Sequence, residues 1–213
     1  MVISKQRLVA PLVRQFHNPT GAGGHLAGWV MGRRTSNVAR SRWAVALLDV
    51  APADRVLELG CGPGVAISAL AARATCGLVV GVDRSEVMVG QARRRNARAV
   101  REGRVRLIAS AVEDLPEQGT DAPFDAPFDA ALAINTVGFW IDPVTRLAEV
   151  RAHLVPNGRI ALVSQPRIPG ATVSTSAAAA TELAELLTGA GFADTRVETL
   201  ALNPPAVFVL ART

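Results

Sequence analysis

The segment RVLELGCGPGVAISALA, which spans Arg55–Ala71, constrains the fold more than any other part of the sequence. An apolar run ends in three glycines at alternate positions, Gly60, Gly62 and Gly64, and a helix-like run follows. A glycine-rich turn between a strand and a helix lets backbone N–H groups approach a ligand closely. The segment therefore predicts an α/β unit with a ligand site at the end of its first strand.

After residue 50, short apolar runs alternate with longer helix-like runs, a pattern typical of a parallel sheet covered on both faces. The expected strands are Arg55–Gly60, Leu78–Asp83, Val105–Ser110, Phe128–Asn135 and Arg159–Ser164. The expected helices are Val65–Arg73, Ser85–Val100, Pro143–Leu154 and Ala177–Ala190. Two later runs, TRVETLAL and AVFVLAR, have no helix between them and indicate an antiparallel pair at one side of the sheet.

We therefore expect one domain, residues 1–213, with a doubly wound α/β fold. Its seven-stranded sheet is mostly parallel with an antiparallel C-terminal strand, and helices cover both faces. Residues 51–213 form the core that carries the ligand site. Residues 1–50 form an arm that is too short for a core of its own and includes a helix over Asn37–Asp49. This arm either closes over the site as a lid or packs on the sheet edge.

Composition and charge exclude several classes of protein. Two cysteines without a CxxC pair and three scattered histidines predict neither a disulfide framework nor a metal site. No apolar run reaches the ~18 residues that a membrane span needs, and no signal peptide precedes the core, so we expect a cytoplasmic location. The net charge of +5 comes almost wholly from arginine, which we attribute to coding bias. The arginine-rich stretch QARRRNARAVREGR is expected to be a solvated helix face, and His153 a surface residue.

The details of the glycine loop predict which ligand it holds. No Gly-Lys-Ser/Thr follows, which excludes a P-loop, and the G-x-G-x-G spacing differs from the G-x-G-x-x-G of dinucleotide sites. Asp83 ends the second expected strand, where a carboxylate can accept both ribose hydroxyls. We expect this carboxylate to be exposed without ligand. Glu58, two residues before the loop, serves equally well as a ligand contact or as structural support. The pattern predicts a nucleoside ligand.

Five segments together resemble a known family. They are VLELGCGPG, VVGVDRSEVMVGQA, SAVEDLP, FDAALAINTV and LVPNGRIALVS. Their order and spacing resemble those of the class I S-adenosylmethionine-dependent methyltransferases, most closely the small ubiquinone/menaquinone-type "methyltransferase type 11" group. The resemblance covers about residues 50–213. It implies a Rossmann-like methyltransferase fold, S-adenosylmethionine as cofactor and S-adenosylhomocysteine as product.

The resemblance also implies which residues bind the cofactor. They are Glu58, Gly60, Cys61, Gly62, Gly64, Asp83, Arg84, Met88, Ala111, Val112, Glu113 and Asn135. The loop residues surround the methionine part and the ribose, and Asp83 holds the ribose diol. Arg84 and Met88 flank the adenine, and Asn135 lies beside the methyl group. Ala111 stands where the family often has aspartate, so adenine recognition falls on the next two residues. Cys61 is a small loop residue and not a nucleophile.

Methyl transfer requires a nucleophile held in line and shielded from water, without a metal. The chain contains no tyrosine, which excludes a phenolic base. The catalytic candidates are His17 and Asn135. The other candidate bases for a hydroxyl acceptor are His25, Asp142 and Glu113. The acceptor-binding candidates are Phe16, His17, Trp29 and Trp140, of which Trp140 reads more often as a packing residue.

The sequence favours a small-molecule or lipid-like acceptor. The expected fourth strand is followed by NTVG, whereas methylases of nucleic-acid bases typically carry Asn/Asp-Pro-Pro-aromatic there. We expect no nucleic-acid partner, no membrane span and a possible homodimer. Three alternatives stay open: a dinucleotide-dependent oxidoreductase, a non-catalytic S-adenosylmethionine-binding partner or regulator, and an RNA methyltransferase that uses the arginines.

Overall fold

The computed structural model of the protein describes residues 35–120 and 122–213. Four residues that the sequence singles out, Phe16, His17, His25 and Trp29, lie outside the described residues. The described part of the expected arm includes α3 (Thr35–Leu47), whose buried apolar residues Ala44 and Val45 join the core cluster that also contains residues of α4 (Val65–Arg73).

A seven-stranded sheet with the order β3-β2-β1-β4-β5-β7-β6 forms the centre of the fold. The strands are β1 (Arg55–Leu59), β2 (Leu78–Asp83), β3 (Val105–Ala109), β4 (Phe128–Ile134), β5 (Leu154–Ser164), β6 (Ala193–Leu200) and β7 (Ala206–Arg212). β1–β5 pair in parallel, and β7 runs antiparallel to both β5 and β6. The central strands β1, β2 and β4 are largely buried on both faces, which explains their mostly apolar sequences.

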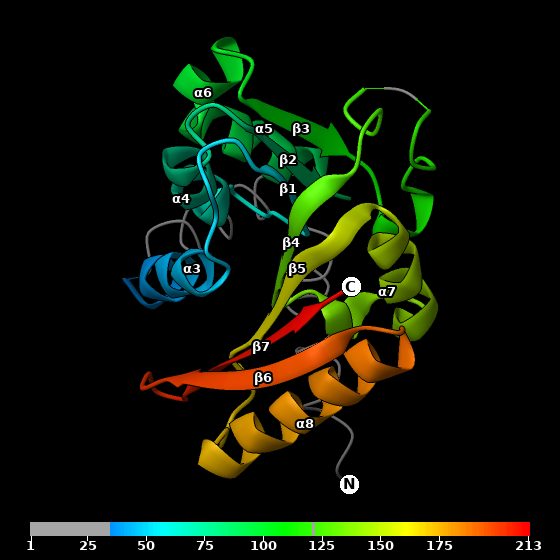
Figure 1. The fold of residues 1–213 in the computed structure, drawn as a ribbon. Helices are drawn as coiled ribbons and strands as arrows, with labels where there is room; N and C mark the ends of the chain where they lie inside the picture. Colours follow the sequence, from blue (N-terminus) through cyan, green and yellow to red (C-terminus); the bar gives the residue numbers. More distant parts are fainter. Residues whose placement is uncertain (1–34, 121) are drawn as a thin grey trace, which may run out of the picture.

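Helices cover both faces of this sheet, as Figure 1 shows. α3, α4, α5 (Glu86–Arg95) and α6 (Ala97–Arg101) lie on one side, and α7 (Pro143–Ala152) and α8 (Val173–Gly189) lie on the other. Two short 3-10 helices, η1 (Val112–Asp114) and η2 (Val137–Phe139), follow β3 and β4. Each face encloses its own apolar cluster. The predicted fold class is therefore confirmed.

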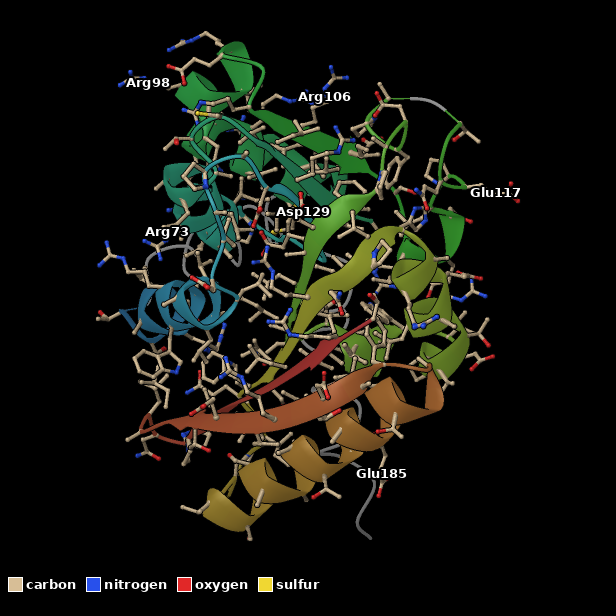
Figure 2. The ribbon with its side chains drawn as sticks, viewed as in Figure 1. Arg73, Arg98, Arg106, Glu117, Asp129 and Glu185 are labelled. Carbon is tan, nitrogen blue, oxygen red and sulfur yellow. The ribbon has the colours of Figure 1, made fainter. Side chains whose placement is uncertain are left out.

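The expected helix over Ser85–Val100 is interrupted at Asn96. Ser85 is the N-cap of α5, as its place before the helical run suggests, and its hydroxyl accepts the Met88 N–H at 3.4 Å. Asn96 is buried and separates α5 from α6, because its side-chain amide donates to the Ala92 carbonyl instead of facing solvent. The arginines on these helices are mostly exposed, and Figure 2 shows Arg98 on the outer side of α6. The expected solvated arginine face is thus confirmed.

The expected surface position of His153 is wrong. The side chain is 5% exposed, and its ring lies 5.5 Å from that of Phe124. α7 ends just before this residue, and the Phe128 N–H of β4 donates to the His153 carbonyl at 2.8 Å. His153 therefore lies in the turn that enters the sheet, where the ring points inward, and not on the outer face of the helix.

The burial of His153 predicts a pH-dependent stability. Burial lowers the pKa of its imidazole, and the charge of Glu149 opposes this shift. The unfolded chain keeps a higher pKa and binds the proton first, so this residue's contribution to stability is lost as the pH falls below about 6.5. We expect the unfolding free energy of the wild type to fall more steeply between pH 7 and pH 5 than that of His153→Gln. Denaturant melts at several pH values measure both slopes, and equal slopes would contradict the prediction.

Candidate functional site

The carboxyl ends of β1, β2 and β4 meet at one edge of the sheet, around the glycine loop. The Gly60 and Cys61 N–H groups both donate to the Val82 carbonyl, at 2.8 and 3.0 Å, and so fix the loop to β2. Gly60 has φ +70°, and a Cβ there would lie 2.4 Å from the Thr136 Oγ1, just after β4. Only glycine allows this conformation and this close approach, so the loop packs directly against the end of β4.

The far side of the loop rests on α5 and its neighbour Asn96. A Cβ on Gly64 would lie 2.7 Å from the Asn96 Nδ2, and this amide donates to the Gly64 carbonyl at 3.1 Å. Arg95 donates from Nε to the Pro63 carbonyl at 2.9 Å. Sequence reasoning missed both contacts. The available signal was an asparagine within a helical run, where its side chain competes for backbone hydrogen bonds.

Gly62 differs from the other two loop glycines. Its φ is +52°, and a Cβ built on it would meet no atom of the described residues within 4 Å. The Gly62 N–H donates to the Asp83 Oδ2 at 2.8 Å. The backbone at this position therefore borders open space next to a carboxylate, as a close-fitting ligand requires.

Asp83 is half-buried in the structure, which corrects our expectation that it is exposed without ligand. Its Oδ1 accepts the Ser85 N–H at 2.9 Å while Oδ2 accepts that of Gly62. Burial raises the pKa of Asp83, and the two backbone hydrogen bonds and Arg84 oppose that shift. Each carboxylate oxygen can accept more than one hydrogen bond. Asp83 therefore combines a structural role with spare acceptor capacity.

Glu58 is a buried carboxyl beneath the loop. Glu58 is 3% exposed, and its Oε2 has no hydrogen-bond partner in the described part of the chain. Burial raises the pKa of Glu58 well above its ordinary value, the charge of Asp83 adds to the shift, and a backbone hydrogen bond from Ile67 opposes it. No ion pair among residues 35–120 and 122–213 includes Glu58. Because an unpaired buried acid is costly, this atom fits a cationic group of a ligand.

Cys61 is buried inside the loop. Burial raises the pKa of its thiol well above the ordinary value, and the charges of Glu58 and Asp83 raise it further. The thiol therefore stays protonated, which agrees with a small loop residue and not with a nucleophile.

The residues expected around the adenine lie near the end of β2. The Ser110 N–H donates to the Asp83 carbonyl at 3.1 Å, which places Ala111 and η1 next to β2. Within η1, Val112 is buried in the core, and the Glu113 Oε1 accepts the Ile141 N–H at 3.1 Å. Arg84 directly follows β2, whereas Met88 is 1% exposed and belongs to the interior of α5. The structure thus gathers this set at one edge, with Met88 largely enclosed by protein.

The residues expected near the methyl group and acceptor follow β4. Asn135 has φ +54°, and its Oδ1 accepts the Gln165 N–H at 2.7 Å. Trp140 is 9% exposed within the apolar cluster, and its Nε1 donates to the Thr136 Oγ1 at 3.2 Å. Asp142 caps α7, and hydrogen bonds from Thr145 lower its pKa. Trp140 therefore has the contacts of a packing residue.

The described residues place further limits on the site. A cavity of about 390 Å³ opens at the other edge of the sheet, beside Leu154 and Thr213, and none of the predicted site residues lines it. Within the described ranges, no group of three or more histidine, cysteine, aspartate or glutamate side chains could hold a metal ion. No helix in this part of the chain has the length and apolar character needed to cross a membrane.

Comparisons with known proteins relate this chain to methyltransferases. Residues 56–158 match a protein family described as "Methyltransferase domain". The uncharacterized methyltransferase YdaC of Bacillus subtilis (strain 168) is 27% identical over 179 residues, which cover 84% of this chain and 92% of YdaC. Trans-aconitate 2-methyltransferase of Variovorax paradoxus (strain S110) is 35% identical over 127 residues, which cover 58% of this chain and 44% of that protein.

Solved structures share the fold. Magnesium protoporphyrin IX methyltransferase from Synechocystis PCC 6803, solved with bound S-adenosylmethionine, superposes with a TM-score of 0.59 at 16% identity, covering 93% of this chain and 88% of that chain. Several matched proteins are longer than this chain, which spans 35% and 44% of two curated relatives and 59% and 60% of two structural neighbours.

Proposed function

We propose that this chain, which the comparisons relate to the class I S-adenosylmethionine-dependent methyltransferases, transfers a methyl group to a small-molecule or lipid-like acceptor. S-adenosylmethionine is the methyl donor that this family and its structural neighbours imply. The ubiquinone/menaquinone-type subgroup, a cytoplasmic location and a homodimer stay predictions from the sequence.

The observation that carries the proposal is the unfilled space beside the Gly62 backbone, together with two nearby carboxyl groups, Asp83 and Glu58, that have different hydrogen-bond partners. Asp83 is fixed by two backbone N–H groups and keeps acceptor capacity for a ribose diol. Glu58 has a buried oxygen without a partner, which fits the ammonium group of the cofactor's amino-acid part. These residues therefore fit S-adenosylmethionine at both its nucleoside and its amino-acid ends.

The bound donor supplies an activated methyl group on a sulfonium, which a nucleophile attacks in line. The chain's own task is to bind, orient and exclude water. Asn135 is held rigidly at the end of β4 by the Gln165 N–H, so it supports orientation in our proposal and not proton transfer. Asp142 and Glu113 are both engaged by backbone N–H groups of their neighbours.

Calorimetry with S-adenosylhomocysteine and with NAD tests the proposal, and a turnover assay with labelled S-adenosylmethionine separates an enzyme from a non-catalytic binding module. We expect binding of S-adenosylhomocysteine at micromolar concentration and no measurable binding of NAD. Tight binding of NAD alone would overturn the proposal. Binding of S-adenosylhomocysteine without turnover on any acceptor in apolar and polar extracts would favour the regulator alternative. Strongly salt-dependent RNA binding would favour the RNA methyltransferase.

Two glycine variants give a matched test of the loop. Gly62→Ala has only the strain of a positive φ, about 1–2 kcal/mol, because its Cβ meets no protein atom. We expect this variant to fold and to lose at least about 10-fold in affinity for S-adenosylhomocysteine, because the new methyl group occupies ligand space. Gly60→Ala collides with Thr136 and is expected to lose more stability. Thermal melts and calorimetry measure both effects, and unchanged affinity in folded Gly62→Ala would contradict the prediction.

A further inference from the structure

A buried arginine with an unusual environment lies next to the proposed site. Arg40 of α3 is 6% exposed. Its Nη1 donates to the Gln165 Oε1 at 2.6 Å, and its Nη2 donates to the Asn37 Oδ1 at 3.3 Å. Its Nε is buried and has no hydrogen-bond partner among the described residues. A guanidinium carries five N–H donors, so two bonds to neutral amides leave much of its hydrogen-bonding capacity unused.

Among the residues that the structure describes, no carboxylate pairs with this charge. None of the ion pairs within residues 35–120 and 122–213 includes Arg40. Residues 1–34 contain no aspartate or glutamate. A second cation, Arg167, lies close enough to add to the effect of burial, and together they lower the pKa of Arg40 to about 10. Buried charges are normally paired, so the arrangement calls for an anion from outside the chain.

Arg40 is connected to the proposed methyl-transfer site through Gln165. Its partner Gln165 follows β5, donates its backbone N–H to Asn135 and donates its side-chain Nε2 to the Pro204 carbonyl at 2.9 Å. The second bond fixes the amide so that Oε1 faces Arg40. Asn135 precedes Thr136, which packs against Gly60 of the glycine loop. A short chain of contacts therefore joins the arginines to the loop, on the β4–β5 side of the site.

We propose that Arg40 and Arg167 bind an anionic group of the acceptor, with a carboxylate as the best match. This inference rests on the proposed function, because it assigns the substrate class of the same site. A carboxylate matches the planar donor pattern of a guanidinium and makes charge-assisted hydrogen bonds with it. Arg167 also donates to Asn37, so the amide and the two guanidiniums form one connected cluster around the binding position.

The wild-type protein provides the first test, with stated probes. Protein saturated with S-adenosylhomocysteine is titrated with succinate, benzoate and hexanoate, and in parallel with the amide of each acid. The amides match the acids in shape but lack the charge. We expect at least one acid to bind at least about 10-fold more tightly than its amide, as measured by calorimetry or thermal shift. If no acid exceeds its amide, the proposal is wrong.

Variants assign that binding to the cluster. Arg40→Met should weaken binding of the preferred acid at least about 10-fold, and Arg40→Lys should restore part of it. Arg42→Met is the matched control, because Arg42 is exposed on the same helix. If Arg40→Met does not fold, Arg167→Met replaces it, because Arg167 is exposed and its loss leaves the core intact. Equal acid binding by the wild type and the folded variant would overturn the proposal.

The carboxylate of the cofactor is the other anionic group that Arg40 and Arg167 could bind. S-adenosylhomocysteine carries that carboxylate, whereas 5′-methylthioadenosine lacks it. The proposal expects Arg40→Met to bind both nucleosides as the wild type does. If the variant loses affinity for S-adenosylhomocysteine alone, the arginines hold the cofactor and the assignment to the acceptor is overturned. If wild-type protein binds neither nucleoside, the proposed function itself fails, which is a separate outcome from failure to discriminate acids from amides.

Discussion

Glu58→Gln is expected to weaken binding of S-adenosylhomocysteine at least about 10-fold while making the ligand-free protein more stable. The affinity falls because glutamine cannot supply the charge for a hydrogen bond to the ligand's ammonium group, a bond worth about 1.5–3 kcal/mol. The stability rises because the wild-type carboxyl is buried with an unpartnered oxygen beside Asp83. Calorimetry and thermal melts measure the two effects on the same samples.

The pH dependence of Glu58→Gln gives an additional signature. Because burial and Asp83 raise the pKa of Glu58 in the folded protein, the folded state favours the protonated acid. Wild-type stability is therefore relatively high at low pH and is lost as the pH rises through that raised pKa. The stability gain of Glu58→Gln should thus be largest at pH 8 and shrink toward pH 5. Binding of S-adenosylhomocysteine by the wild type should release protons, which titrations in buffers of different ionisation enthalpy detect.

Glu185→Gln is the matched control for this experiment. Figure 2 shows Glu185 on α8, which packs on the face of the sheet opposite α3–α6. The side chain is exposed, so its loss should change neither affinity nor stability beyond about 0.5 kcal/mol. If Glu58→Gln binds S-adenosylhomocysteine as tightly as this control, Glu58 is a structural acid and not a ligand contact.

The strands were predictable because the buried parallel strands are short, mostly apolar runs. β1 and β2 match their expected bounds within a residue. β5 begins at Leu154, five residues earlier than expected, because Asn157 adopts φ +62° within a bulge of the strand. The sequence Pro156-Asn157-Gly158 indicates a turn, and only the pairing with β4 shows that the strand continues through it.

The site was predictable in its backbone and much less so in its contacts. Parallel strands bring their carboxyl ends together, so the grouping of Gly60, Gly62 and Asp83 follows from sequence order alone. The contact between Arg40 and Gln165 joins residues 125 positions apart, and no local sequence pattern predicts it. The unpartnered oxygen of Glu58 likewise depends on how closely its neighbours pack. Local sequence reports where the backbone turns, but not which buried polar atoms go unpaired.

Asp83→Asn is expected to lower affinity for S-adenosylhomocysteine about 10- to 100-fold and to destabilise the ligand-free protein. Both carboxylate oxygens accept backbone N–H groups, from Ser85 and Gly62. An amide can accept only one of them, and its NH₂ group then faces the other donor, which costs about 1–3 kcal/mol. Calorimetry gives the affinity, and denaturant melts give the stability. This is a larger structural effect than an exposed strand-end carboxylate would produce.

Three ligands separate the two roles of Asp83. If the carboxylate holds the ribose diol, Asp83→Asn should weaken S-adenosylhomocysteine and 5′-methylthioadenosine by similar factors, because both contain the ribose. A 2′-deoxy analogue of 5′-methylthioadenosine should bind the variant and the wild type with a much smaller difference. Glu58→Gln should weaken S-adenosylhomocysteine but not 5′-methylthioadenosine, since we propose that Glu58 contacts the amino-acid part, which 5′-methylthioadenosine lacks. Were the deoxy analogue to lose as much affinity as its parent, the loss would come from the loosened Gly62 backbone, and the ribose would be held elsewhere.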